Sequence, residues 1–436
     1  MPVIQPFPAA AVKVPDRPWF ARALRWGTRG GLAVMDYGLI SGSNFVSAVM
    51  LARWMSPESY GGYATGFSIY LLFLLLFQSI VLEPMSVLGC STYSHCRRGY
   101  VQTVKWLCIT GSVAVAGLLA LAGVLAYSLG AGGGLPGGLL GLAVATPSLF
   151  YFWLTRRVFY LDLSSGSAAW GAVFYVVIAI GGLYVAKWHG LVSPFMAFAL
   201  MGLASTATDF ALAAKLNRSL PPNRHRPDHR EVLRRHWEYG RWAICSAFGS
   251  WSGTNVYYPL LSTFAGLAQA GEMKALINLT APLSQTMASV SMLALPYAAR
   301  KGRGHATRVS RNLTFIFVGL GAAYWAIVLP FQSQVFHFLY KGAYAAAVTF
   351  VPLYALMSIL NSALNGPIVM LRGLNFPESV FVARVGGAVA SMAIGIPATW
   401  AYGLYGATTG VILASLITFL IGQVLLCRRL ASTKIS

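Results

Sequence analysis

Long apolar runs separated by short polar turns recur from residue 31 to residue 427. Each run has about 20 residues or more, the length that crosses the hydrocarbon core of a bilayer as an α-helix. None alternates apolar and polar residues as the strands of a membrane barrel do. The pattern predicts an all-α polytopic membrane protein with about twelve transmembrane helices, at 31–52, 62–90, 103–129, 138–161, 166–186, 191–215, 238–262, 272–298, 312–332, 345–371, 379–401 and 405–427.

The composition agrees with a protein that lies in a membrane. Hydrophobic residues make up 57% of the 436 residues and charged residues only 10%, whereas soluble domains carry roughly 25% charged residues. The net charge of +21 would indicate nucleic-acid binding in a soluble protein, but its distribution gives another explanation. All but four of the 32 Lys and Arg residues fall on the side of the two termini. By the positive-inside rule, both termini are expected to be cytoplasmic, in the inner (plasma) membrane, with no nucleic-acid partner.

The chain divides near its middle at a basic segment that contains several prolines. The interpretations of this segment are a hinge whose arginines contact anionic lipid and a solvated cytoplasmic loop; both stay open. The turn Leu51–Ala64 has a fainter copy at Gly266–Lys274, in which Gly271 matches Gly61, and this indicates two related halves. The expected units are a cytoplasmic tail and interfacial helix (1–30), an N-lobe of helices 1–6 (31–215), a basic linker (216–236), a C-lobe of helices 7–12 (237–427) and a cytoplasmic tail (428–436).

Acidic residues within the apolar runs are candidates for binding a coupling ion, because an ionisable group in a span usually faces the bundle interior or water. Asp36 shares a helix face with Ser43 and Ser47. This face is either a cation or proton site in a cavity or a packing seam of small polar groups. Glu83, before Pro84 in the second helix, either titrates during transport or forms a structural ion pair.

Basic and amide residues within the spans are candidates for binding a substrate. Arg156 and Arg157 end the fourth helix after an aromatic cluster. They are either interfacial arginines or lumen guanidinium groups, which bind phosphate well because of their bidentate geometry. The full set of lumen candidates is Arg156, Arg157, Arg384, Arg241, Lys274, Asn278 and Asn255.

Motifs of enzyme and cofactor chemistry are absent from the sequence. It has no Walker A motif, no dinucleotide-binding glycine motif and no zinc-protease motif. Cys90, His95 and Cys96 have irregular spacing, so we expect no metal site. The sequence therefore predicts neither an enzyme nor a cofactor, and any driving energy must come from a gradient, the substrate or a partner.

Four short motifs in a fixed order resemble those of one transporter family. They are Leu-Ala-Arg-Trp-Met-Ser-Pro-Glu-Ser-Tyr-Gly-Gly-Tyr-Ala at 51–64, Leu-Pro-Tyr-Ala-Ala-Arg at 295–300, Phe-Leu-Tyr-Lys-Gly-Ala-Tyr at 338–344 and Tyr-Gly-Leu-Tyr-Gly-Ala-Thr at 402–408. The chain resembles polysaccharide flippases, the Wzx-type lipid-linked oligosaccharide translocases of the multidrug/oligosaccharidyl-lipid/polysaccharide exporter (MOP) superfamily. Met55 and Ser56 stand where Leu and Gly are usual in the first motif.

The resemblance implies a fold and a function. It implies two six-helix lobes around a central cavity, alternating access, and translocation of a polyprenyl-pyrophosphate-linked oligosaccharide for a surface polysaccharide such as an exopolysaccharide or O-antigen. The implied partners are membrane lipids, the lipid-linked glycan and a polysaccharide polymerase or export complex. Two alternatives stay open: a cation-coupled multidrug antiporter of the same superfamily, and a non-transport membrane subunit of a glycan-assembly complex.

Overall fold

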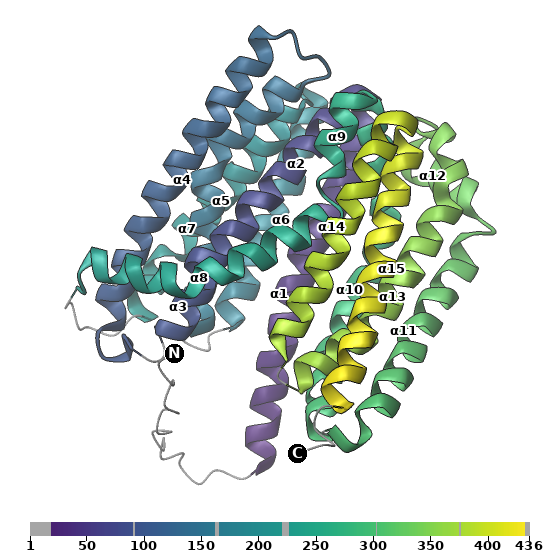
Figure 1. The fold of residues 1–436 in the computed structure, drawn as a ribbon. Coiled ribbons are helices and arrows are strands. Elements are labelled where there is room, and N and C mark those ends of the chain that lie inside the picture. Colours follow the sequence, from purple (N-terminus) through teal and green to yellow (C-terminus); the bar gives the residue numbers. More distant parts are fainter. Residues whose placement is uncertain are drawn as a thin grey trace.

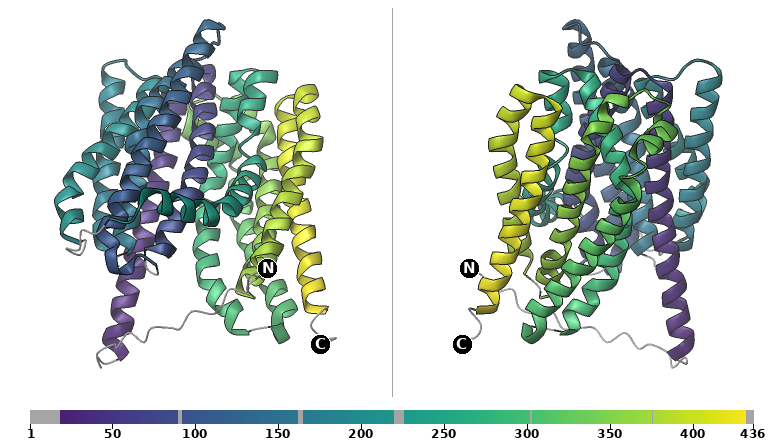
Figure 2. Two further views of the ribbon diagram at one scale, coloured as in Figure 1. Left: turned by 60° about the vertical axis from the view of Figure 1, so that its left-hand side comes forward. Right: turned by 90° about the vertical axis from the view of Figure 1, so that its right-hand side faces the viewer.

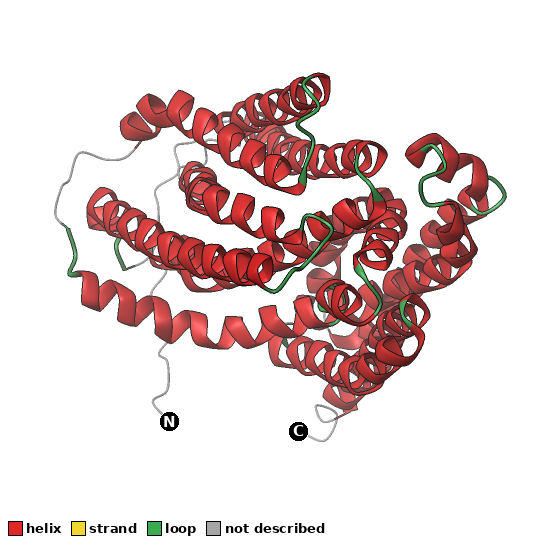
Figure 3. Cartoon of the chain, turned by 90° about the horizontal axis from the view of Figure 1, so that it is seen from above, coloured by secondary structure: helices red, strands yellow, loops and turns green. Residues whose placement is uncertain are grey.

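The structure, a computed structural model, describes residues 19–89, 92–161, 165–219, 226–301, 303–374 and 376–431. These residues form helices and contain no strand, as the cartoon seen from above makes plain (Figure 3). The predicted all-α membrane fold is therefore confirmed. The first half contains α1 (Trp19–Trp54), α2 (Pro57–Phe77), a π-helix (Gln78–Leu82), α3 (Glu83–Leu88), a 3-10 helix (Ser94–Cys96), α4 (Arg97–Ser128), α5 (Leu135–Leu161), α6 (Ser165–Trp188) and α7 (Pro194–Ser219).

The second half begins with a helix of different orientation. Most long helices run along one common axis, and α8 lies across them (Figure 1). The elements are α8 (His229–Ser252), α9 (Tyr257–Phe264), α10 (Leu267–Lys301), a 3-10 helix (Arg303–His305), α11 (Ala306–Val328), α12 (Gln332–Tyr340), a 3-10 helix (Ala345–Phe350), α13 (Val351–Gly373), α14 (Pro377–Tyr402) and α15 (Leu404–Ala431).

Membrane crossing agrees with the predicted pattern for most of the chain. Within the described ranges, nine helical segments are long and apolar enough to cross a bilayer, and each corresponds to a predicted span. The three other predicted spans correspond to α1, to α8 with α9, and to α10. The start of α1 and the end of α15 lie at the same end of the bundle (Figure 1), as an even number of crossings requires.

The seventh predicted span, 238–262, differs from a continuous helix. α8 ends at Ser252, a turn follows, and α9 begins at Tyr257. The backbone N–H groups of Thr254 and Asn255 both donate to the carbonyl of Trp251, which closes this end of α8. The early part of α8 is rich in arginine and histidine, which are costly in hydrocarbon, so the crosswise orientation in Figures 1 and 2 is the one that spares them this burial. Residues 229–236 of the predicted linker form its first two turns.

The first helix begins earlier in the sequence than the predicted first span. Residues 19–29, expected as a separate interfacial helix, are the first turns of α1, which continues without a break to Trp54. In Figure 1 this part of α1 projects beyond the neighbouring helices of the first half. The second span has an irregularity just before Pro84, where the π-helix Gln78–Leu82 interrupts the α-helical backbone.

The buried hydrophobic side chains of the two halves form one continuous core. Tyr60 and Phe67 of α2 belong to the same cluster as Met273 of α10 and Tyr354 of α13. The halves are thus packed against each other along α2 and α10, and the candidate site lies along this contact.

Candidate functional site between the lobes

The two glycines matched in the sequence meet in the structure, where α2 and α10 pack with their backbones in direct contact. A Cβ atom on Gly61 would lie 1.7 Å from the carbonyl oxygen of Leu267. A Cβ atom on Gly271 would lie 2.7 Å from the carbonyl oxygen of Pro57. Each glycine thus faces the start of the other helix, so the internal repeat of the sequence corresponds to a reciprocal packing of the two halves.

A cluster of tyrosines lies beside this glycine contact. The Tyr60 hydroxyl accepts a hydrogen bond of 3.0 Å from the Asn278 side chain. The Tyr60 ring lies 5.9 Å from the ring of Tyr344, which lies 5.5 Å from that of Tyr340. The Tyr340 hydroxyl donates to the carbonyl of Ala275 at 2.9 Å. These rings come from α2, α12 and the loop after α12, so they seal the two halves together at this level.

Lys274 lies on α10 within the same contact. Its Nζ atom lies 4.3 Å from the ring centroid of Phe67 and 5.9 Å from that of Tyr258. It takes part in none of the ion pairs formed by the described residues. The aromatic faces stabilise the ammonium group, but no carboxylate neutralises it. This site therefore has an uncompensated positive charge between the lobes.

Hydrogen bonds to backbone atoms close the same face. Arg53, at the end of α1, donates to the carbonyl oxygens of Phe338 and, at 2.5 Å, of Leu339 in α12. The Ser68 hydroxyl donates to the carbonyl of Asn255 at 2.6 Å, and the Trp251 indole donates to the carbonyl of Ser68 at 2.8 Å. The turn after α8 is thereby fastened to α2. By the predicted topology, Arg53 lies on the external side, so we call the contact formed by Arg53, Gly61, Leu267, Gly271 and Phe338 the external seal.

Two predicted site residues meet inside the N-lobe rather than between the lobes. Arg156 of α5 forms an ion pair of 2.6 Å with Asp36 of α1, and both side chains are at least 96% buried. Tyr160 donates a hydrogen bond to the same carboxylate, and the guanidinium carbon lies 4.6 Å from the ring centroid of Trp153. The predicted coupling-ion carboxylate and a predicted phosphate-binding arginine thus neutralise each other in this conformation.

The polar face that follows Asp36 on α1 lines a small pocket of the N-lobe. Ser43, Asn44 and Ser47 line it together with Tyr63 and Tyr175. Asp36 is not one of its lining residues. The pocket therefore offers hydroxyl and amide groups, without the carboxylate that a tight cation site would need.

The remaining predicted residues lie apart from these two clusters. Arg157 and Arg384 are half-buried, and Arg241 on α8 and Glu83 at the start of α3 are exposed. Asn255 lies in the turn after α8 and Asn278 lies on α10, both in contact with α2.

The structure adds residues that the sequence analysis did not single out. These are Tyr60, Phe67 and Tyr344. The signal available for them was their aromatic character in or near the motifs: Tyr60 lies in the turn 51–64, Phe67 follows that turn, and Tyr344 ends the motif 338–344. Their grouping around Lys274 and Asn278 depends on the contact of α2 with α10, which links residues about 200 positions apart.

Comparisons with known proteins identify the fold. No family model matches the chain, and no curated protein sequence does. A multidrug resistance MATE family transporter of the MOP superfamily, solved in an inward-facing conformation, superposes with a TM-score of 0.72 at 13% identity, covering 92% of this chain and 96% of that one. An outward-facing structure of such a transporter gives 0.62 at 13% identity, covering 93% and 95%. The lipid II flippase MurJ in an inward closed conformation gives 0.64 at 12% identity, covering 92% and 86%.

The chain therefore has the fold of MOP superfamily transporters, which agrees with the superfamily predicted from its motifs. The superposition is better with the inward-facing structure than with the outward-facing one.

Proposed function

We propose that this protein is a flippase that moves a polyprenyl-pyrophosphate-linked oligosaccharide across the inner membrane by alternating access. The observation that carries the proposal is the uncompensated charge of Lys274 between the lobes, beside the hydroxyl and amide groups of Tyr60 and Asn278. A cation beside hydrogen-bonding groups and aromatic faces suits a headgroup that combines phosphate with sugar.

The physical problem that such a transporter solves is the transfer of a charged headgroup through hydrocarbon. A pyrophosphate without a partner cannot enter a medium of low dielectric constant, because the loss of hydration costs tens of kcal/mol by Born estimates. A cationic passage between the lobes replaces water around the phosphates, while the polyprenyl tail stays in the bilayer. Arg157 and Arg384, both half-buried, are further basic side chains that we expect the headgroup to contact.

In this mechanism the headgroup is loaded from the cytoplasm while the external seal is closed. Release needs α2 and α10 to separate at Gly61 and Gly271, and needs Arg53 to leave the carbonyl oxygens of α12. Contacts between backbone atoms at the glycines allow the closed state to be tight and the open state to be reached by a rigid separation of two helices.

A cation-coupled multidrug antiporter is the second candidate, favoured by the likeness of the fold to a multidrug resistance transporter. Two observations weigh against it. Asp36 is already paired with Arg156, so a cation would have to displace a guanidinium group from a buried carboxylate. The polar pocket of the N-lobe has no acidic residue in its lining.

A binding measurement with purified full-length protein tests the proposed substrate class. We expect a short-chain polyprenyl pyrophosphate to bind to the wild type and to bind 10- to 100-fold more weakly to Lys274→Met, because one hydrogen bond to a charged group contributes about 1.5–3 kcal/mol. Lys274→Arg is expected to retain binding. Lys187→Met, which removes an exposed lysine at the external end, is the matched control.

The same measurement with a cationic dye separates the two candidate functions. Tight binding of the dye together with weak binding of the pyrophosphate would favour the antiporter. Equal affinity of Lys274→Met and wild type for the pyrophosphate would remove Lys274 from the site.

A further inference from the structure

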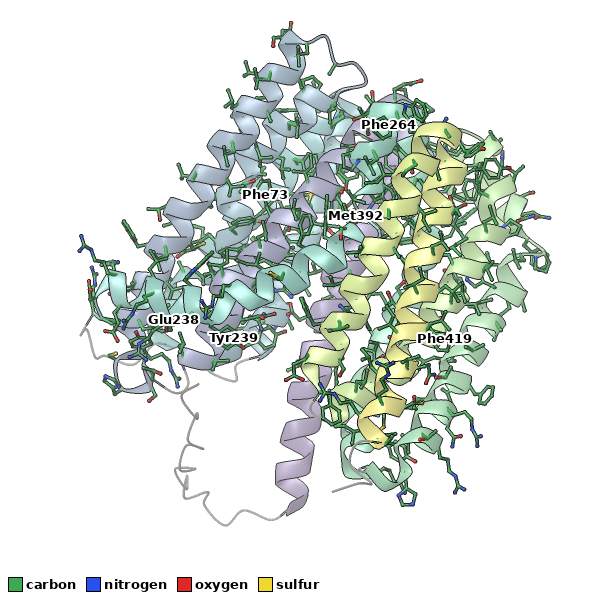
Figure 4. The ribbon with its side chains drawn as sticks, in the orientation of Figure 1. Phe73, Glu238, Tyr239, Phe264, Met392 and Phe419 are labelled. Atoms are coloured by element: carbon green, nitrogen blue, oxygen red, sulfur yellow. The ribbon has the colours of Figure 1, made fainter. Side chains whose placement is uncertain are left out.

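The most distinctive surface outside the lobe contact is the outer side of α8. This helix crosses the front of the molecule in Figure 1 and in the left view of Figure 2, and Figure 4 labels two of its exposed residues, Glu238 and Tyr239. One face of α8 is buried and consists of Val232, His236 and Gly240, at spacings of four residues. The opposite side remains open and carries most of the charge of the helix.

The buried face fixes the height of α8 in the membrane. The His236 ring donates to the carbonyl of Ile80 at 2.9 Å and lies 2.8 Å from the Tyr100 hydroxyl, in the first turn of α4. A Cβ atom on Gly240 would lie 2.9 Å from the carbonyl oxygen of Ser79. The first half of α8 is therefore level with the start of α4, whose span is predicted to begin near residue 103. By the predicted topology, this is the level expected for the lipid headgroups on the cytoplasmic side.

The exposed face combines arginines with large apolar side chains, and it also carries Glu238, which lies 3.9 Å from Arg234 in an exposed ion pair. Arg230, Arg234, Trp237, Arg241 and Phe248 follow one another at spacings of four, three, four and seven residues, so they lie on one side of the helix. All five are exposed, Trp237 by 54% and Phe248 by 48%. We call these five residues the basic-aromatic stripe.

We propose that the basic-aromatic stripe of α8 binds anionic phospholipid headgroups at the cytoplasmic surface of the bilayer. Helices that lie in the plane of the membrane interface have this composition, with aromatic residues in the acyl boundary and basic residues at the phosphates. The occupant is a lipid surface rather than a protein, because three arginines and two large aromatic side chains share one exposed side of a crosswise helix that begins at the expected headgroup level. The proposal is independent of the transported substrate.

The site has a consequence for the two lobes. The first half of α8 packs on the π-helix and α4 of the N-lobe, and Gly249 near its other end packs against Val385 of α14. A lipid bound along the stripe would therefore hold a helix that contacts both lobes. The content of anionic lipid in the membrane would therefore influence how α8 is held against the two lobes.

Native mass spectrometry of the full-length protein tests the proposal, with phosphatidylglycerol as the probe and phosphatidylcholine as its neutral counterpart. We expect R230Q/R234Q to bind phosphatidylglycerol about 30-fold more weakly than the wild type, because each basic residue near an anionic surface contributes about 1 kcal/mol. R308Q/R311Q removes two exposed arginines from α11 and is the matched control, expected to bind as the wild type does.

Several outcomes would overturn the proposal. They are unchanged phosphatidylglycerol binding by R230Q/R234Q, an equal loss in R308Q/R311Q, equal binding of phosphatidylcholine by the wild type, and displacement of the lipid by millimolar inorganic phosphate. If R230Q/R234Q does not fold, as judged by circular dichroism and gel filtration, the single variants R230Q and R234Q are measured instead. Each is expected to bind phosphatidylglycerol about 5-fold more weakly than the wild type.

Discussion

Gly61→Ala is the substitution that most directly perturbs the external seal. The new Cβ atom would lie 1.7 Å from the carbonyl oxygen of Leu267 and 2.5 Å from its carbonyl carbon. Both atoms belong to the backbone of α10, so no side-chain rotation relieves the clash, and α2 and α10 must move apart. Overpacking of this kind costs about 1–3 kcal/mol. A cost of about 2 kcal/mol confined to the closed state moves the conformational equilibrium about 30-fold toward separation of the helices.

Distances between spin labels measure this shift. Labels replace Leu129 after α4 and Tyr402 at the end of α14, which are 84% and 73% exposed, in a background without native cysteines. We expect the wild type to give a short distance and Gly61→Ala to give a longer, broader distribution. Gly117→Ala is the matched control, because its Cβ atom would meet nothing within 4 Å.

The result that would refute the reasoning is a Gly61→Ala variant with the distance distribution of the wild type. If that variant does not accumulate, Gly271→Ala serves instead, because its Cβ atom would lie 2.7 Å from the Pro57 oxygen and causes a smaller clash. An unchanged distribution in the surviving variant would mean that the glycine contact does not close the external end.

Three further predictions follow from other contacts. Arg53→Lys should weaken the seal in the same distance measurement, because one ammonium group cannot reproduce the fork of hydrogen bonds to Phe338 and Leu339; wild-type distances would contradict this. Arg156→Ala should lower the free energy of unfolding by about 3–5 kcal/mol, because it leaves the buried Asp36 carboxylate unpaired. The double variant Asp36→Asn/Arg156→Ala should lose less stability, and equal losses in the two variants would contradict an ion pair. Burial lowers the pKa of His236, which precedes the seventh predicted span. The neutral imidazole therefore stabilises the docking of α8 fully when the pH is above about 6.5, the usual pKa of histidine, and this stabilisation is lost as the pH falls through the lowered pKa. His236→Gln should make the protection of the α8 amides, measured as the exchange rate relative to the intrinsic rate at each pH, constant across that window, and a pH profile of protection equal to that of the wild type would contradict this origin.

Much of the fold was predictable because the length of each apolar run and the match between the two glycine-containing turns can be read directly from the sequence. Apolar runs predicted the long helices, and the match of Gly61 with Gly271 pointed to the packing of α2 on α10. The break of the seventh span was missed because Asn255 and its neighbours end α8 by hydrogen bonds to Trp251, within a stretch whose overall composition still fits a span.

The candidate site was less predictable, because it depends on contacts between distant segments. The pairing of Asp36 with Arg156 joins residues 120 positions apart, and the sequence gives no sign that these two candidates neutralise each other. Lys274 and Asn278 were found from their polarity within an apolar run, whereas their aromatic surroundings come from α2 and α9. The lumen roles of Arg157, Arg384 and Arg241 stay predictions.

The central claim is translocation of an anionic lipid-linked glycan, and reconstitution into liposomes tests it most directly. A polyprenyl-pyrophosphate-linked oligosaccharide with a fluorescent sugar is placed in both leaflets, and its accessibility to an external glycosidase is followed over time. The account predicts that the wild type exposes the inner pool to the enzyme, that Lys274→Met does so at least 10-fold more slowly, and that Lys187→Met matches the wild type. An inner pool that stays protected in wild-type liposomes, or a rate for Lys274→Met equal to that of the wild type, would contradict it.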